Sequence, residues 1–231
     1  MDHKALWRDR LPEEVSFWRQ WLHGDEYRED RERRLTPNRE VRPYVGAILD
    51  AVGPQDEWRV LDVGAGPVTA VGMRHGAGHV RVVPVDPLAD YYEALLVEAA
   101  VTPPIRTTWC HGELLRERFA PASFDMTYAE NALDHSYDPL AIIDQMVALT
   151  RPGGTVLLEH RRNEGENQQY QGLHQWNFDL EGTTVILWNA QHRVSLNEAL
   201  AGRVVVVPWY VPEVNWLNVQ LRVLPVADPD A

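Results

Sequence analysis

Two short segments of the chain gather histidines and carboxylates that could carry acid–base chemistry. The first, "ENALDHSYDP", covers residues 130–139, and the second, "EHRRNEGENQQYQGLHQWNF", covers residues 159–178. A histidine or a carboxylate within hydrogen-bond reach of a hydroxyl or an amine can take its proton during a reaction. The candidate catalytic residues are His135, His160, Glu164 and His174.

A structural role competes with the catalytic role in both segments. In the first, Asp138 could cap a helix that begins at Pro139, while Asp134 and His135 form a local hydrogen-bonded pair. In the second, the polar side chains could belong to a solvated connection around one buried tryptophan. The second segment has no apolar period and many hydrogen-bonding and aromatic groups, which favours a pocket lining over a core element.

A metal site is a further interpretation of the second segment. His160, His174 and Glu164 could ligate an ion, but their spacing fits no standard motif, so we predict no metal site. Cys110 is the only cysteine among the 231 residues. An intrachain disulfide and a cysteine-based zinc site are therefore excluded.

A glycine-containing loop points to ligand binding. The stretch "RVLDVGAGPVTAVG", residues 59–72, reads as a strand that runs into Gly64 and Gly66. Glycines let the backbone approach a ligand closely and adopt positive φ angles. Val68 stands where many nucleotide-binding loops have a third glycine, and Asp62 adds a negative charge before the loop. A cationic ligand fits this loop better than a diphosphate does.

Asp86, at the end of the next predicted strand, could accept hydrogen bonds from both hydroxyls of a ribose. Dinucleotide-binding folds share such an acidic residue, so an enzyme that uses NAD is the rival interpretation. A pyrophosphate, however, needs free amides at a helix start and a third glycine. Pro67 removes one amide here and Val68 adds a side chain, which weighs against NAD.

These residues must be positioned by an α/β architecture. Helical stretches, clearest at 88–99 and 138–149, separate short apolar runs, and this alternation predicts a parallel sheet covered on both faces. The runs that read as strands are 59–63, 80–85, 105–110, 124–129 and 155–160. Three later runs lack crossover helices and are expected to close the sheet as antiparallel strands. They are 183–189, 203–208 and 214–224.

Residues 1–52 are predicted to form a helical cap, with one helix at 12–22 and another after Pro37. The charged segment 25–34 is expected to be a solvated helix or loop. The alternative is a mobile cap in which Arg31, Arg33 or Arg34 reaches an anionic group. Residues 53–231 are predicted to form the α/β domain, with an acceptor-binding insertion at about 160–182.

Four segments in order, "VLDVGAGP", "VDPLADYY", "FDMTYAENALDH" and "LTRPGGTVLLEH", resemble the successive motifs of class I S-adenosylmethionine-dependent methyltransferases. The resemblance covers about residues 40–160. It implies a Rossmann-like three-layer α/β sandwich with a central, mostly parallel, seven-stranded sheet. In that family the third glycine is often lost, because the first loop approaches the amino-acid part of the cofactor rather than a phosphate.

The resemblance also implies which residues bind the cofactor. Many relatives have an acidic residue for the adenine amino group where this chain has His111, so either adenine recognition differs or Glu113 takes that role. The implied residues are Asp62, Gly64, Ala65 and Gly66 at the methionine moiety, Asp86 at the ribose, Pro87 and Leu88 beside the adenine, the loop His111, Gly112, Glu113 and Leu114 flanking the base, and Asn131 and Ala132 near the sulfonium.

Composition narrows the acceptor and the compartment. The net charge of −12 lowers the odds of nucleic acid as a partner, and no apolar run approaches the ~20 residues of a membrane span. We therefore predict a cytoplasmic enzyme, monomeric or homodimeric, that methylates oxygen or nitrogen of a metabolite, sugar or natural-product intermediate and releases S-adenosylhomocysteine. The alternative is a protein of this fold that binds the cofactor or its product without methylating.

Overall fold

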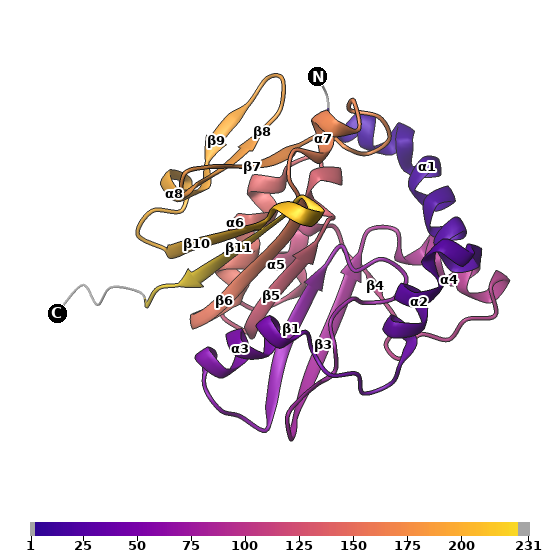
Figure 1. Ribbon diagram of the computed structural model, residues 1–231, viewed down its shortest axis with the longest axis horizontal. Helices are drawn as coiled ribbons and strands as arrows, with labels where there is room; N and C mark the ends of the chain where they lie inside the picture. The colour runs from indigo at the N-terminus through magenta and orange to yellow at the C-terminus, as the bar shows by residue number, and fades with distance from the viewer. Residues whose placement is uncertain (1–2, 226–231) are drawn as a thin grey trace.

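An eight-stranded sheet forms the centre of the computed structural model, which describes residues 3–225 (Figure 1). Its order is β10-β11-β6-β5-β1-β3-β2, and β4 also pairs with β3. Neighbours from β6 through β4 are parallel, whereas β10, β11 and β2 pair antiparallel. The strands are β1 (Glu57–Val63), β2 (Arg74–His75), β3 (Gly78–Asp86), β4 (Thr108–Trp109), β5 (Phe124–Glu130), β6 (Thr150–Arg161), β10 (Val204–Val211) and β11 (Trp216–Val223). The expected mostly parallel sheet is confirmed, and β2 adds a short hairpin strand to seven others.

Helices cover both faces and one edge of this sheet. In Figure 1, α3 lies in front of the strands, α5 and α6 lie behind them, and α1, α2 and α4 lie together at the β4 edge. The helices are α1 (His3–His23), α2 (Arg28–Leu35), α3 (Pro43–Val52), α4 (Ala89–Glu98), α5 (Leu115–Arg118), α6 (Pro139–Leu149), α7 (Glu164–Asn167) and α8 (Leu196–Ala199). No helix among residues 3–225 is long and apolar enough to cross a membrane.

The inner strands are mostly apolar because both of their faces are buried. Val60, Leu61, Met126 and Val156 have no exposed surface, as expected for parallel strands between two helical layers. Side chains of β1 divide between the layers: Leu61 joins the core around α6, whereas Val60 joins the core around α3. Because successive strand residues point to opposite faces of the sheet, one sheet contributes to two hydrophobic cores, one on each face.

Helix α6 begins as the sequence predicts. The Asp138 carboxylate accepts a hydrogen bond from the amide of Ala141 at 3.0 Å, and Pro139 occupies the first turn. An aspartate cap followed by proline satisfies an orphan amide and presets the backbone. The structural role proposed for these two residues is therefore confirmed, and it fixes the end of the preceding loop that carries His135.

The run 183–189 does not close the main sheet, so that prediction is wrong. Its core, β8, lies in a separate three-stranded sheet between β7 (Asn177–Glu181) and β9 (Arg193–Ser195). The reason is local, because a tight turn with Gly182 at φ +60° pairs β8 with the preceding strand. The two later runs, which form β10 and β11, do extend the main sheet antiparallel as predicted.

The alternation of strand and helix also fails after β1. Residues 64–77 contain no helix, and the chain returns through the hairpin of β2 and β3. The strand expected at 105–110 is reduced to the two residues of β4. The glycine loop is therefore followed by irregular backbone rather than by a helix.

Candidate active site

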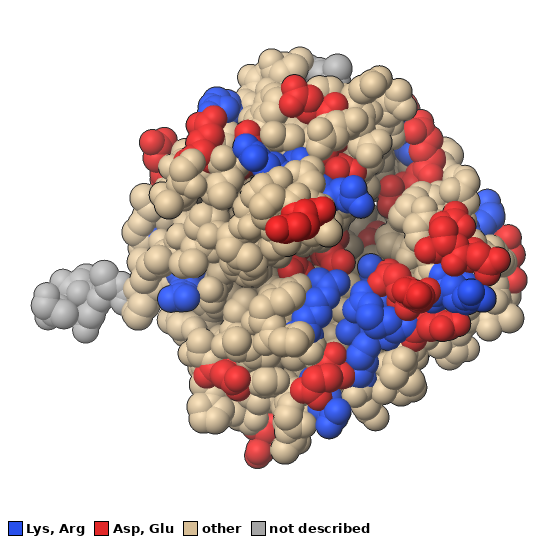
Figure 2. All heavy atoms as spheres, viewed as in Figure 1, with Lys and Arg blue, Asp and Glu red and all other residues tan. Residues whose placement is uncertain are grey.

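A cavity of about 710 Å³ opens at the carboxyl ends of β1, β3 and β5. Helix α1, with Trp7, Glu14 and Trp18, lines the side opposite the strand ends. Figure 2 shows a hollow beside the position of α2, with acidic and basic side chains mixed at its rim. Ligands of open α/β sheets bind at this edge, and the volume lies within the ~300–1,000 Å³ of small-molecule sites.

The amides of the glycine loop are already committed to the protein. The amides of Gly64 and Ala65 donate to the carbonyl of Val85, at 2.9 and 3.1 Å. The Gly66 amide donates to the carboxylate of Asp86 at 3.1 Å. A phosphate cradle needs such amides free. This loop therefore lacks the donors that a pyrophosphate would require.

Both glycines of the loop allow close approaches. Gly64 has φ +73°, and a Cβ there would stand 2.4 Å from the Cβ of Ala132. Gly66 has φ +63°, and a Cβ there would meet the indole of Trp18 at 2.5 Å. These positions need glycine for the packing of the neighbouring loop and of α1, in addition to the backbone conformation.

Two buried aspartates flank the loop. The hydroxyl of Thr69 donates to Asp62 at 2.5 Å, and the Leu88 amide donates to Asp86 at 2.8 Å. Burial raises the pKa of Asp62 to about 7 and that of Asp86 to about 6, because water no longer solvates the charged carboxylates. A cationic ligand placed here would restore the charged forms.

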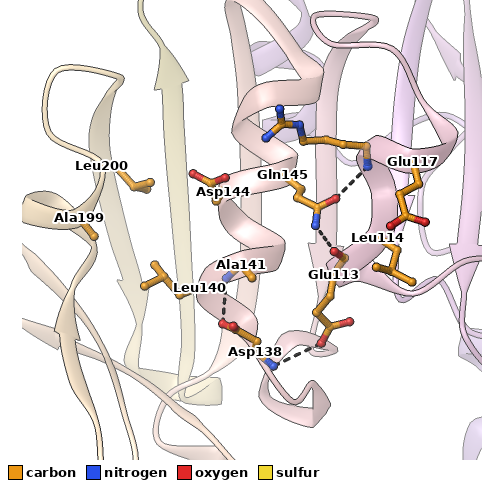
Figure 3. A pocket seen from close by; sticks show the side chains of 11 residues that line it. Glu113, Leu114, Glu117, Asp138, Leu140, Ala141, Asp144, Gln145, Ala199 and Leu200 are labelled. Atoms are coloured by element: carbon orange, nitrogen blue, oxygen red, sulfur yellow. Dashed lines mark hydrogen bonds between the residues drawn. The ribbon is translucent and has the colours of Figure 1, made fainter. Parts of the chain in front are cut away.

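The loop between β4 and α5 carries His111 and Glu113. The His111 ring lies 5.1 Å from the ring of Trp7 and 5.9 Å from that of Tyr137, between centroids. Burial lowers its pKa, and Lys4 and Arg8 lower it further. The carboxylate of Glu113 accepts a hydrogen bond from the Asp138 amide at 3.3 Å (Figure 3).

A triad of polar side chains, Asp134, His135 and His174, stands near the opposite end of the cavity. Nδ1 of His174 lies 2.8 Å from Oδ2 of Asp134 and 3.0 Å from Nε2 of His135. The third separation, from Nε2 of His135 to Oδ2 of Asp134, is 3.4 Å. The 3-10 turn η3 (Leu133–His135) brings the first two residues to this point, and the α7–β7 connection brings His174.

The charges around the triad determine its protonation. Burial alone would raise the pKa of Asp134, but the positive field of His135 and the hydrogen bond from His174 lower it to about 2. Burial would lower the pKa of His135, yet the carboxylates of Asp134, Glu14 and Glu164 outweigh it and raise that pKa. The Oε2 atom of Glu14 lies 3.6 Å from Nδ1 of His135, so α1 contributes to this end of the cavity.

His160 lies behind the triad and does not reach the cavity surface. Only 1% of the residue is exposed, and its ring stacks on Phe178 with centroids 4.0 Å apart. Burial lowers its pKa to about 4. Its Nδ1 atom is 4.0 Å from Oδ1 of Asp134, and among the described residues neither ring nitrogen has a hydrogen-bond partner. The sequence expectation placed His160 on the rim, whereas pairing of β6 between β5 and β11 buries it.

Residues 61–158 match the family model of the methyltransferase domain. This part of the chain therefore matches a methyltransferase domain, in agreement with the class I S-adenosylmethionine-dependent motifs of the sequence. Its cofactor is S-adenosylmethionine, and it is an enzyme. No curated protein matches the chain in sequence.

Solved structures share the fold of this methyltransferase at low sequence identity. One is a chain from the complex of the Haloferax volcanii Trm112 methyltransferase activator with a methyltransferase: it is 14% identical, with a TM-score of 0.53, over 90% of this chain and 96% of that one. Another is phosphoethanolamine N-methyltransferase 2 of Haemonchus contortus, bound to S-adenosyl-L-methionine, at 18% identity and a TM-score of 0.51. That match covers 90% of this chain and 56% of the other.

Most of the cofactor residues that the family resemblance implies line the cavity described above. Gly66 is covered by Trp18, and Leu114 instead lines an open outer groove between η2 (Gly112–Leu114) and α6 (Figure 3). The implied cofactor residues that line the cavity are Asp62, Gly64, Ala65, Asp86, Pro87, Leu88, His111, Gly112, Glu113, Asn131 and Ala132. Of the catalytic candidates, those on its surface are His135, Glu164 and His174.

The family motifs miss the contribution of the N-terminal segment. Arg34 lines the cavity, where it donates to Asp30 at 2.8 Å and stands 3.8 Å from Glu130. Trp18 packs on Tyr92 and also lines the cavity. The tryptophans and arginines clustered before residue 40 were the sequence signal for this contribution, but helical spacing alone does not show which helix face lines a ligand site.

Proposed function

We propose that this methyltransferase transfers the methyl group of S-adenosylmethionine to a hydroxyl or an amine of a small molecule. The observation that carries the proposal is the cavity of about 710 Å³, which α1 of the same chain lines opposite the strand ends. Its size suits the cofactor together with a small acceptor. A macromolecular acceptor would instead need the reacting end to lie open at the surface.

The charges of the cavity support a cofactor pose. The carboxylate of Asp62 would face the ammonium group of the methionine moiety, and Asp86 would accept the ribose hydroxyls. Both are buried carboxylates, and no cationic side chain of residues 3–225 lies within hydrogen-bond distance of either. Arg34 is the cavity arginine nearest the loop, with its Nη1 atom 3.3 Å from the carbonyl of Val68, and it would bind the methionine carboxylate.

The acceptor would then lie between the sulfonium and the polar group formed by His135, His174 and Glu164. In the reaction its oxygen or nitrogen attacks the methyl carbon, the carbon–sulfur bond breaks, and sulfur keeps the electron pair to give S-adenosylhomocysteine. The proton of the acceptor passes to a neighbouring base or to water. Alignment of donor and acceptor supplies much of the rate in such a displacement. The acidic surface, with Glu13 and Glu14 beside this end, favours a neutral or cationic acceptor over a nucleic acid.

The proposal is tested by incubating the protein with S-adenosylmethionine and pooled metabolites that carry hydroxyls or amines. Release of S-adenosylhomocysteine, with a methylated product identified by mass spectrometry, is the expected result. The Asp86→Ala variant, with weakened cofactor binding, serves as the control and should form less product at low cofactor concentration. Product formation only with RNA or protein added would overturn the small-molecule assignment.

A further inference from the structure

We propose that Asp134, His135 and His174 bind a divalent transition-metal ion at the acceptor end of the cavity. The inference rests on the proposed function for the role of the ion, but the binding site itself stands on the geometry of these three side chains. Two imidazoles and one carboxylate form a ligand set that binds iron(II) and zinc with open coordination positions.

The spacing of the three donor atoms matches that of ligands around one ion. Oδ2 of Asp134, Nε2 of His135 and Nδ1 of His174 are separated by 2.8, 3.0 and 3.4 Å. Bonds of about 2.1 Å to a shared ion, at angles between right and tetrahedral, place neighbouring ligand atoms about 3.0–3.4 Å apart. Two of the separations fall within this range and the third is slightly shorter, so the three atoms lie close enough to share one ion.

Hydrogen bonds alone account poorly for this convergence. Nδ1 of His174 can carry one hydrogen, yet it has two short contacts, one to Asp134 and one to His135. If the hydrogen on Nδ1 of His174 points at the Asp134 carboxylate, no well-oriented hydrogen bond is left for the contact between Nδ1 of His174 and Nε2 of His135. A cation shared by all three atoms removes the conflict.

His160 gives a second, independent observation. It is almost fully buried, neither of its ring nitrogens has a partner among the described residues, and Nδ1 lies 4.0 Å from Oδ1 of Asp134. That carboxylate oxygen is also buried and unpartnered. Outer hydrogen bonds commonly orient metal-binding carboxylates. His160 is therefore assigned as a positioning residue that holds Asp134 once the ion draws the carboxylate into place.

The open side of the ion would face the acceptor. His135 and His174 line the cavity, and so does Glu164, while Asp134 lies behind them. A hydroxyl of the acceptor that binds the ion would lose its proton more readily, because the metal stabilises the alkoxide. The proton passes to water or to Glu164, and the oxygen then attacks the methyl carbon as sulfur leaves with the bonding electrons.

The experiment uses the full chain after treatment with a chelator and dialysis. Titration with Co²⁺ is followed by visible absorption, and titration with Zn²⁺ by calorimetry. We expect one equivalent to bind, with the absorption of a protein-bound low-symmetry cobalt centre. His174→Ala and Asp134→Asn should weaken binding by more than the ~10–100-fold typical of losing an outer partner, and His160→Ala by about that range. The exposed His23 offers the matched control His23→Ala, which should bind as the wild type does.

Failure of the wild type to bind one equivalent would overturn the inference without recourse to any variant. Equal binding by wild type and His174→Ala would overturn it as well, and calorimetry with S-adenosylhomocysteine would verify that the variant is folded. The proposed function fails separately: metal binding with no acceptor methylated leaves the site standing. Full methylation by metal-free protein would remove the catalytic role of the ion and leave the methyl transfer intact.

Discussion

The indole of Trp18 lies directly against Gly66, so that a Cβ atom at Gly66 would stand 2.5 Å from Cη2 of the ring. This contact joins α1 to the loop after β1. Trp18 also packs on Trp21 and Tyr92, with ring centroids 5.6 and 5.9 Å away. The second glycine of the motif therefore serves the docking of the N-terminal helix.

Gly66→Ala should destabilise the protein and weaken binding of S-adenosylhomocysteine. The new methyl group would displace Trp18, and φ +63° strains any side chain. Gly76→Ala is the matched control, since Gly76 has φ +57° but nothing within 4 Å of a Cβ. The control should show only the cost of the left-handed backbone, about 1–2 kcal/mol. Chemical unfolding and calorimetry would measure both variants, and equal effects would refute the role of Trp18.

Asp86→Ala should lower affinity for the cofactor by roughly 10–100-fold, the loss of one charged contact to a pair of hydroxyls. The carboxylate also accepts hydrogen bonds from the amides of Gly66 and Leu88. Loss of these bonds should disorder the loop and weaken cofactor binding further. Asp90→Ala, in the exposed first turn of α4, is the matched control and should change nothing. Unchanged affinity in Asp86→Ala would show that the ribose lies elsewhere.

Affinity for S-adenosylmethionine should fall as the pH is lowered from 7.5 to 5. Burial holds the pKa of Asp62 at about 7 and that of Asp86 at about 6, so both carboxylates become protonated over this interval. The cationic cofactor favours their ionised forms, and binding should release protons, with affinity falling by about tenfold per pH unit for each coupled proton. Asp62→Asn should bind more weakly at pH 7.5 and show a flatter profile. A flat profile in the wild type would contradict the assignment of Asp62.

His135→Ala and His174→Ala should lower turnover while leaving affinity for S-adenosylhomocysteine nearly intact. Both side chains line the cavity at the end where we propose that the acceptor binds, whereas the glycine loop and Asp86 lie where we propose that the cofactor binds. His192→Ala, an exposed histidine outside the cavity lining, is the control. Single-turnover rates and calorimetry separate the two effects. Full activity in both variants would place the acceptor away from this end.

The sequence predicts the sheet well because the signals for parallel strands are local. Short, mostly apolar runs at 59–63, 124–129 and 155–160 each form a largely buried strand, and Asp138 with Pro139 marks the start of α6. Strand β8 is the exception, because it pairs with β7 instead of joining the main sheet. An apolar run does not specify its partner strand, and here a glycine turn decided it.

The candidate site was predictable only where the family motifs extend. The loop residues and Asp86 converge because the carboxyl ends of parallel strands meet at one edge. The contact of His174 with Asp134 joins positions 40 residues apart, across an insertion without a motif. Sequence reasoning therefore grouped His174 with Glu164 and His160, whereas the fold groups it with Asp134 and leaves His160 buried behind them.

Arg42→Met should destabilise the protein by about 3–5 kcal/mol, the cost of removing one partner from a buried ion pair. The guanidinium contacts Glu130 at 2.8 Å and Glu159 at 3.0 Å, and the side chain of Glu159 has no exposed surface. Tyr44 and Tyr128 also donate to Glu159, but neither supplies charge. The exposed pair of Arg81 with Glu57 provides the control Arg81→Met, for which we expect at most ~1 kcal/mol.

The pH dependence of the Arg42→Met effect separates lost charge from lost packing. Burial would raise the pKa of Glu130, but Arg34 and Arg42 outweigh it and keep that pKa below its usual value. In the wild type the stabilisation is thus present above the unfolded pKa of about 4.3 and is lost as the pH falls through the lower folded value. In the variant the buried carboxylates take up protons instead, so the gap between the two unfolding curves should narrow from pH 7 to pH 4. A gap that stays constant would show that Arg42 acts through packing alone.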